Sequence, residues 1–152
     1  MLDRYYEDYQ VGERFVSRGR TLTEADIVNF AGVSGDWYPL HVDVEYSKRS
    51  QFGQRIAHGM LVLTIASGLV PISPDVFVAF YGIDNIRFTA PTFIGDTIHV
   101  EVEIVEKQDR GPGGVLTFRQ EVRKAGGDLC ATGVWKVLMK SRAVAEAEAA
   151  RG

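Results

Sequence analysis

Residues 58–70, His58-Gly59-Met60-Leu61-Val62-Leu63-Thr64-Ile65-Ala66-Ser67-Gly68-Leu69-Val70, decide the fold that this sequence predicts. The segment contains no acidic residue, and its apolar side chains recur at helical spacing. They form a broad apolar surface made of Leu61, Val62, Ile65, Ala66, Leu69 and Val70. A helix that is apolar over so much of its surface is expected to be buried by other elements. We therefore predict a buried central helix over residues 58–70.

The chain that follows has the pattern of β-strands, predicted over residues 76–89, 97–107, 115–124 and 129–140. Alternation is plainest where Ile98, Val100, Val102 and Ile104 are separated by His99, Glu101 and Glu103. Glycine-rich breaks at 111–114 and 126–128 suit tight turns, so the last three strands should form an antiparallel meander. A curved sheet needs apolar material against its concave face. The sequence therefore predicts an α+β fold in which an antiparallel sheet wraps the 58–70 helix.

The residues before this helix are predicted to form a short strand followed by another helix. A strand is expected over Phe15–Arg20. Thr21 and Thr23 are both candidate N-caps, because each has an acidic residue three positions later. The helix that begins there should stop before Gly35.

The segment Asp36-Trp37-Tyr38-Pro39-Leu40-His41 is expected to be a shaped loop rather than a regular helix. Pro39 has no amide hydrogen and disfavours the helical conformation at the residue before it. A short helical turn is expected over 43–50. We predict one domain over residues 1–140 and a frayed or disordered tail over 141–152, which is rich in Ala and Glu and has no wide apolar stripe.

Composition narrows the classes of protein that the chain can belong to. At 152 residues, with 45% hydrophobic and 24% charged residues, it is predicted to fold as one soluble domain. A net charge of −3 gives no general attraction to nucleic acid or to an anionic membrane. The N-terminus has no cationic stretch leading into an apolar one, so a cytoplasmic location is expected. The single Cys130 provides neither an intramolecular disulfide nor a thiolate metal site.

Asp36 and His41 lie five positions apart (41 minus 36) on the constrained loop, so both side chains can converge on one small molecule. A carboxylate and an imidazole placed in this way can hold a water molecule and exchange protons with it, as general acid and base catalysis requires. The alternative from spacing alone is that Asp36 caps a turn and His41 is a hydrogen-bonded core histidine.

Gly59 lies at the expected start of the central helix. The first amides of a helix have no partner within it, and its dipole is positive at that end, so the Gly59 N–H is suited to hold a developing enolate oxygen. The alternative is that His58 and Gly59 only shape the helix entrance.

Two segments in combination resemble the signatures of a known family. Residues 30–43, which contain Gly35-Asp36-Trp37-Tyr38-Pro39-Leu40-His41, are similar to the signature of MaoC-like and (R)-specific enoyl-CoA hydratases, whose core is Gly-Asp-x-Asn-Pro-x-His. Ala57-His58-Gly59-Met60-Leu61 is similar to the family's second motif. Arg87-Phe88-x-x-Pro91 and Gly95-Asp96-Thr97 resemble the strand and turn that follow its helix. The resemblance covers roughly residues 5–140.

The resemblance implies a hot-dog fold and a homodimer, or a higher homo-oligomer, with pooled sheets and active sites near the interface. It implies a hydro-lyase of fatty acid metabolism that reversibly hydrates a trans-2-enoyl-CoA to an (R)-3-hydroxyacyl-CoA. It also implies no metal, and no cofactor beyond the coenzyme A of the substrate. Asp36 and His41 are then the catalytic pair, and the Gly59 amide holds the enolate oxygen. The substrate-binding residues are expected to be Trp37, Tyr38, Pro39, His58 and Ser67, of which Ser67 matches a serine that helps arrange the family's active site.

The chain departs from the family's pattern at Tyr38, which stands where the family has asparagine. A phenol offers one O–H and much more bulk than an amide, so Tyr38 is expected either to brace the loop by another contact, to line the acyl pocket or to mark altered chemistry. Lys48, Arg49 and Arg55 are weaker candidates for contacts with coenzyme A phosphates, because such clusters are usually solvated.

Two other functions remain open from sequence. A hot-dog thioesterase would hydrolyse a similar substrate, but thioesterases of this fold place their acid on the central helix, where this chain has none. A non-catalytic acyl-binding subunit is the second alternative, which Tyr38 supports and the retained Asp36, His41 and Gly59 oppose. The direction of the reversible reaction cannot be chosen from sequence.

Overall fold

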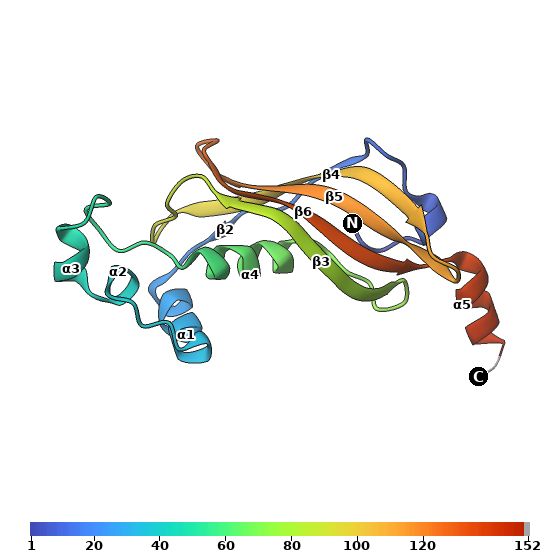
Figure 1. Ribbon diagram of the computed structural model, residues 1–152, viewed down its shortest axis with the longest axis horizontal. Coiled ribbons are helices and arrows are strands. Elements are labelled where there is room, and N and C mark those ends of the chain that lie inside the picture. The colour runs from blue at the N-terminus through green and yellow to red at the C-terminus, as the bar shows by residue number, and fades with distance from the viewer. Residues whose placement is uncertain (151–152) are drawn as a thin grey trace.

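The computed structural model describes residues 1–150 of the chain. Its central helix, α4 (Gly59–Leu69), lies against the concave side of an antiparallel sheet (Figure 1). The prediction of a buried helix is confirmed, because six of its apolar side chains are buried: Leu61, Val62, Leu63, Ile65, Ala66 and Leu69. The fold is therefore the α+β arrangement that the sequence predicts.

The sheet has six strands: β1 (Arg14–Val16), β2 (Arg20–Thr21), β3 (Phe77–Phe88), β4 (Thr97–Asp109), β5 (Gly113–Lys124) and β6 (Leu129–Lys140). The strand order is β1-β4-β5-β6-β3, and β2 also pairs with β4. All strand pairs are antiparallel, so the predicted meander of the last three strands is confirmed. Ile98, Val100, Val102 and Ile104 of β4 are buried, as their alternation predicts.

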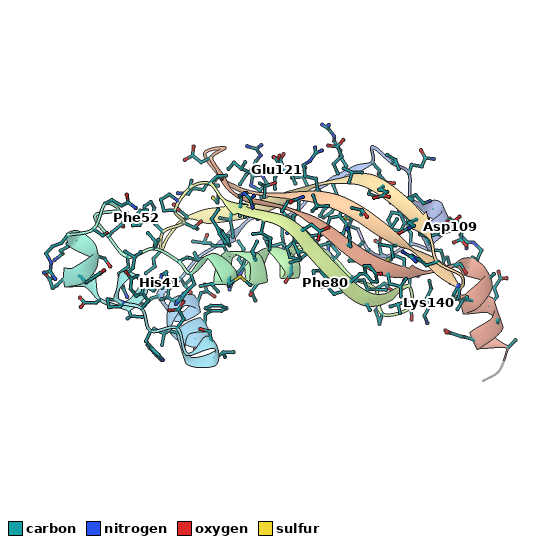
Figure 2. All side chains as sticks on the ribbon, in the orientation of Figure 1. His41, Phe52, Phe80, Asp109, Glu121 and Lys140 are labelled. Atoms are coloured by element: carbon teal, nitrogen blue, oxygen red, sulfur yellow. The ribbon has the colours of Figure 1, made fainter. Side chains whose placement is uncertain are left out.

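Strand β3 forms one edge of this sheet and is irregular. Its pairing with β6 has three register shifts, and Asn85 between Asp84 and Arg87 has a φ of +54°. The large apolar side chains of Val78, Phe80 and Tyr81 are exposed along it. Figure 2 shows Phe80 on this strand, away from the charged side of the sheet where Glu121 lies. Register shifts are common at a sheet edge, whereas a row of exposed apolar side chains is unusual in an edge strand that faces only water.

Three α-helices precede α4: α1 (Glu24–Ser34), α2 (Pro39–Val42) and α3 (Val44–Lys48). In Figure 1, α1 lies below the end of the sheet, and α2 and α3 extend beyond it. Of the two candidate N-caps, the structure uses Thr23, which forms a capping box with Asp26. Gly35 ends α1 in the left-handed conformation, with a φ of +75°. Asp43 caps α3 by accepting from the Tyr46 N–H. The N-terminal chain also contains a short 3₁₀ helix, η1 (Tyr6–Asp8).

Two local predictions in the N-terminal half are wrong. Pro39 begins a helix, α2, because a proline at the first helical position needs no amide hydrogen and already has a helical φ. The predicted strand at 15–20 is divided into β1 and β2. Ser17 lies between them and uses its hydroxyl to accept the Val100 N–H, which replaces a regular ladder contact.

The C-terminal segment contains a helix, α5 (Arg142–Ala149), capped by the Ser141 hydroxyl. An ion pair of 3.0 Å joins Arg142 of α5 to Asp8 of η1. Residues 151–152, which belong to the predicted tail, lie outside the described residues. Within residues 1–150 no helix is both long and apolar enough to cross a membrane.

Candidate active site

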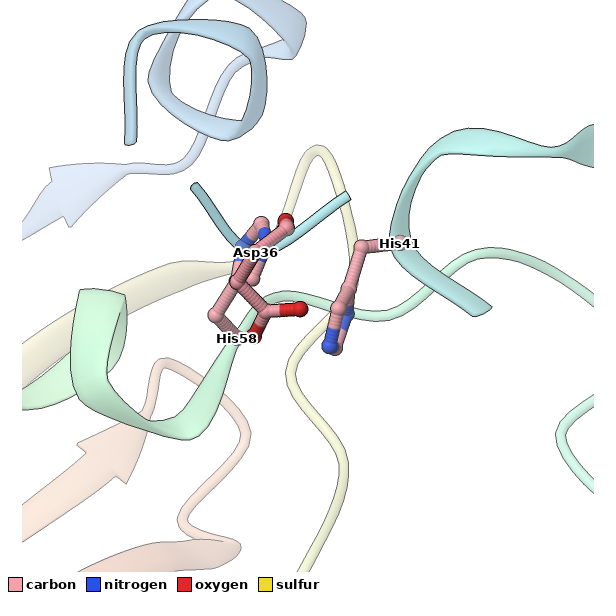
Figure 3. Close-up of side chains that lie close together, drawn as sticks. All are labelled: Asp36, His41 and His58. Carbon is pink, nitrogen blue, oxygen red and sulfur yellow. The ribbon is translucent and has the colours of Figure 1, made fainter. Parts of the chain in front are cut away.

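Asp36 lies in a tight loop directly after α1. The left-handed conformation of Gly35 reverses the chain, and the Asp36 carboxylate then accepts the Tyr38 N–H at 3.2 Å. Pro39 starts α2 immediately afterwards, so that His41 lies on the first turn of that helix. Figure 3 shows the Asp36 carboxylate directed toward the His41 ring. The conformation of this loop therefore brings the two predicted catalytic side chains, Asp36 and His41, close together.

One ring nitrogen of His41 is held by the backbone. Its Nδ1 lies 2.8 Å from the Ile56 carbonyl oxygen. A carbonyl oxygen only accepts, so we assign the proton of the neutral ring to Nδ1. His41 Nε2 then carries a lone pair, as a general base requires.

His58 contacts both Asp36 and His41. It is only 2% exposed, and its Nε2 donates to the backbone carbonyl of Asp36 at 3.0 Å. Its ring stacks on that of His41, with centroids 3.9 Å apart and an interplanar angle of 29°. Phe30 packs against its other side at 5.0 Å between centroids. His58 was expected to contact substrate, whereas the structure places it where it positions Asp36 and His41.

The three side chains form one compact group. A carboxylate oxygen of Asp36 and one ring nitrogen from each histidine all lie within 4.8 Å of one another. Hydrogen bonds to water span about 2.7–3.2 Å, so polar atoms this close to one another can bind the same water molecule. Nitrogen and oxygen atoms are also ligands that a metal ion accepts, and the bonds of the two histidines to backbone carbonyls leave one nitrogen available on each ring. We interpret the group as a water-binding site.

Burial lowers the pKa of His41 below its ordinary value of 6.5, and the nearby His58 lowers it further. The Ile56 carbonyl and the Asp36 carboxylate act in the opposite direction. The net effect keeps the ring neutral at pH 7, in the form that can accept a proton.

The lowered pKa of His41 predicts how an activity that uses this residue as a base depends on pH. Because protonated His41 cannot act as a base, kcat/KM should be constant near neutrality and fall as the pH drops through the lowered pKa. The midpoint of that acid limb should lie below 6.5. Initial rates across a pH series check this expectation. A midpoint above 6.5, or no acid limb at all, would contradict it.

Gly59 begins α4 directly after His58, and within residues 1–150 its N–H has no hydrogen-bond acceptor. Gly59 and His41 both line a largely apolar cavity of about 440 Å³. The walls of the cavity come from the chain before α4, the start of α4, the end of β3 with the residues that follow it, and β6. The other lining residues are Phe52, Ile56, Ala57, Met60, Val62, Phe88, Thr89, Ala90, Pro91, Thr92 and Cys130. The predicted base and the predicted oxyanion donor therefore face one space.

The ring of Phe88 lies directly against Gly59. A β-carbon built at Gly59 would lie only 2.8 Å from Cζ of Phe88. A larger residue at position 59 would therefore require the half-exposed Phe88 ring to shift.

Replacing Gly59 with alanine should lower kcat/KM by up to about 100-fold, because the new methyl group moves either the helix start or the Phe88 ring. The companion substitution Phe88→Leu in the Gly59→Ala background should restore part of the loss, since it makes room for the methyl group. Steady-state kinetics of both single variants and the double variant test this coupling. If the two substitutions changed kcat/KM independently, the contact between Gly59 and Phe88 would have no role in catalysis.

The other predicted site residues are dispersed. Trp37 and Tyr38 are exposed on the loop, and the Tyr38 hydroxyl lies 3.1 Å from that of Tyr46 on α3. This contact braces the loop where the family has asparagine. Pro39 is half-buried at the start of α2. Ser67 lies two turns of helix beyond Gly59 and lines a different pocket.

The three basic residues considered for phosphate binding differ in their surroundings. Arg55 is held by Glu24 through two hydrogen bonds of 2.5 and 2.7 Å. Lys48 pairs with Glu45 at 2.7 Å. Arg49 has no ion pair within residues 1–150.

Sequence reasoning missed Ile56 and the role of Phe88. Ile56 contacts His41 through its carbonyl oxygen, which any residue possesses, so no sequence signal identifies this contact. Phe88 stands in the Arg87-Phe88-x-x-Pro91 stretch, but its contact with Gly59 depends on how β3 lies beside α4.

Comparison with known proteins identifies the family of the chain. The family model described as MaoC like domain matches residues 8–124, and the chain belongs to this family. It is 42% identical over 105 residues to Protein MaoC of Klebsiella aerogenes, a match that covers 68% of this chain and 31% of that protein. It is 37% identical over 126 residues to an (R)-specific enoyl-CoA hydratase of Rhodospirillum rubrum, covering 80% and 83% of the two chains. The chain thus matches about a third of the Klebsiella protein and most of the Rhodospirillum enzyme.

Solved structures show the same fold. A structure described as a monoamine oxidase regulatory protein from Archaeoglobus fulgius is 43% identical, with a TM-score of 0.86, and the match covers 91% of this chain and 95% of that one. A Mycobacterium tuberculosis protein described as having a double hotdog fold has a TM-score of 0.80 at 20% identity, covering 91% of this chain and 44% of that one. The sheet that wraps α4 is therefore a hot-dog fold.

Proposed function

We propose that the protein reversibly adds water across the double bond of a trans-2-enoyl-CoA to form an (R)-3-hydroxyacyl-CoA. The observation that carries this proposal is the placement of His41 beside Asp36, on the wall of the same apolar cavity as the Gly59 amide. The hydratase and dehydratase names of several relatives support the same class of reaction.

In the proposed mechanism a water molecule lies between the Asp36 carboxylate and His41 Nε2. Its oxygen attacks C3 of the enoyl thioester while one of the two groups takes its proton. The electrons of the C2–C3 double bond move toward the thioester, whose oxygen becomes negative and is held by the Gly59 N–H. A proton is then delivered to C2, so that one water molecule has been added in total. Both catalytic groups return to their starting states, and no cofactor is needed beyond the coenzyme A of the substrate.

A homodimer is part of the proposal. Strand β3 is an edge strand, and Val78, Phe80 and Tyr81 leave it apolar and exposed. Such an edge suits pairing with the same strand of a second copy, which extends the sheet and buries these side chains. The cytoplasmic location stays a prediction.

The proposal is tested by supplying crotonyl-CoA and longer or branched 2-enoyl-CoAs and following loss of the conjugated enoyl absorbance. Thiol release is measured in parallel. Loss of absorbance without free thiol is the expected result. Free thiol would indicate a thioesterase instead, and acyl-CoA binding without any turnover would indicate a non-catalytic subunit.

A further inference from the structure

Tyr38 connects the two residues of the candidate catalytic pair. Its backbone N–H donates to the Asp36 carboxylate at 3.2 Å, and its carbonyl accepts the His41 N–H at 2.9 Å. Its ring also meets the His41 ring edge-on, with centroids 6.1 Å apart and an interplanar angle of 68°. A displacement of Tyr38 would therefore move Asp36 and His41 together.

The side chain of Tyr38 is held in turn by Tyr46 of α3. The two hydroxyl oxygens lie 3.1 Å apart, and the rings meet edge to face with centroids 6.0 Å apart. The Tyr46 N–H donates to the carboxylate of Asp43, the N-cap of α3, at 2.9 Å. A side chain as short as asparagine hydrogen-bonds within its own loop, whereas the phenol of Tyr38 reaches a residue eight positions away (46 minus 38).

Helix α3 is itself fixed against α2, which carries His41. The side chain of Ser47 on α3 is completely buried. Its hydroxyl oxygen lies 2.8 Å from the Asp43 carbonyl oxygen and 3.1 Å from the carbonyl oxygen of Leu40, the residue before His41. No residue of Val44–Lys48 is among the described residues that line the cavity. Helix α3 therefore supports the loop and α2 from outside the cavity.

The contact between the two tyrosines is better suited to placing catalytic groups than to stabilising the fold. Tyr38 is 52% exposed and Tyr46 is 37% exposed. An exposed hydroxyl that loses its partner bonds to water instead, so the contact adds little to the free energy of unfolding. Catalysis is far more sensitive, because a displacement of about 1 Å can lower a rate by about 100-fold.

We propose that Tyr38 and Tyr46 are a pair of positioning residues: the Tyr46 hydroxyl holds the Tyr38 side chain, and Tyr38 keeps Asp36 and His41 at the spacing that the reaction needs. The inference rests on the proposed hydration of 2-enoyl thioesters. It adds a role for α3, and it gives the tyrosine at position 38 a function that depends on a second tyrosine.

The first test is the substitution Tyr46→Phe, which removes one hydroxyl group and keeps the ring. It should lower kcat for crotonyl-CoA hydration by about 3- to 10-fold. KM and the melting temperature should stay close to those of the wild type, because neither tyrosine is among the described residues that line the cavity. Tyr38→Phe should give the same loss of kcat. The double variant should lose no more than either single variant, since both changes break one contact.

Tyr5→Phe is the matched control, because it removes the same group from another tyrosine. The Tyr5 ring lies under the guanidinium of Arg142, 4.6 Å from its centre, at the end of the molecule opposite to α3 (Figure 1). This variant should retain the wild-type kcat.

A second cycle tests whether the pair acts through His41. In the His41→Asn background the ring that Tyr38 contacts is absent, so the further substitution Tyr46→Phe should lower the residual rate by less than about twofold. A purely structural role would give the same loss in both backgrounds, together with a lower melting temperature.

The outcomes separate this proposal from the proposed function. If the wild type hydrates crotonyl-CoA and Tyr46→Phe has the same kcat, the positioning role is overturned and the hydratase function stands. An equal loss in the wild-type and His41→Asn backgrounds would also overturn it. If the wild type hydrates no enoyl thioester, the proposed function fails and the positioning role fails with it.

Discussion

Replacing His41 with asparagine is expected to lower kcat for 2-enoyl-CoA hydration by about 10²–10⁴-fold. Asparagine keeps a donor near the position of Nδ1, so the bond to the Ile56 carbonyl can be retained, whereas the lone pair at Nε2 is lost. The loss should therefore appear in catalysis with little change in thermal stability. Steady-state kinetics and a melting curve of the same preparation measure both effects.

His99 provides the matched control for this substitution. It lies on β4, and its Nε2 is 3.4 Å from the Glu101 carboxylate on the charged side of the sheet. His99→Asn should leave kcat within about twofold of the wild type, as is usual for surface changes away from a site. If His41→Asn behaved like His99→Asn, the assignment of His41 as the base would be wrong.

Replacing Asp36 with asparagine should have an effect of similar size, about 10²–10⁴-fold in kcat. The amide oxygen of asparagine can still accept the Tyr38 N–H, so the loop is kept while the negative charge is removed. A neutral amide can neither take a proton from water nor stabilise a positive charge on His41. Circular dichroism and kinetics together separate a change of chemistry from a change of fold.

Asp43→Asn is the matched control here, because it changes the same pair of residue types a few positions away. Asp43 caps α3, and asparagine is an equally good N-cap. The control should retain both stability and activity. Near wild-type activity of Asp36→Asn would exclude a catalytic role for this carboxylate.

The fold could be predicted where one periodicity extends over a whole element. The broad apolar surface of 58–70 identified α4, and the strict alternation from Ile98 to Ile104 identified β4. Pro39 was interpreted wrongly, because proline breaks a helix in its interior but suits the first helical position. The split between β1 and β2 depends on a side-chain contact of Ser17 with a distant strand, which no local pattern contains.

The candidate site could be predicted only in part, because some of its contacts join segments that are distant in the sequence. Spacing placed Asp36 and His41 on one constrained loop, and the helix start identified the Gly59 amide. The proton position on His41 depends on a carbonyl fifteen residues away, at Ile56. The contact of Phe88 with Gly59 depends on how distant segments pack. Such contacts can be identified only in the folded structure.

The most direct test of the central claim is to incubate wild-type protein with crotonyl-CoA in water labelled with oxygen-18 and to identify the products by mass spectrometry. Addition of water predicts an intact 3-hydroxybutyryl-CoA thioester that carries one labelled oxygen on C3, with the (R) configuration. Unchanged crotonyl-CoA, or free crotonic acid with the label in its carboxyl group, would contradict the account.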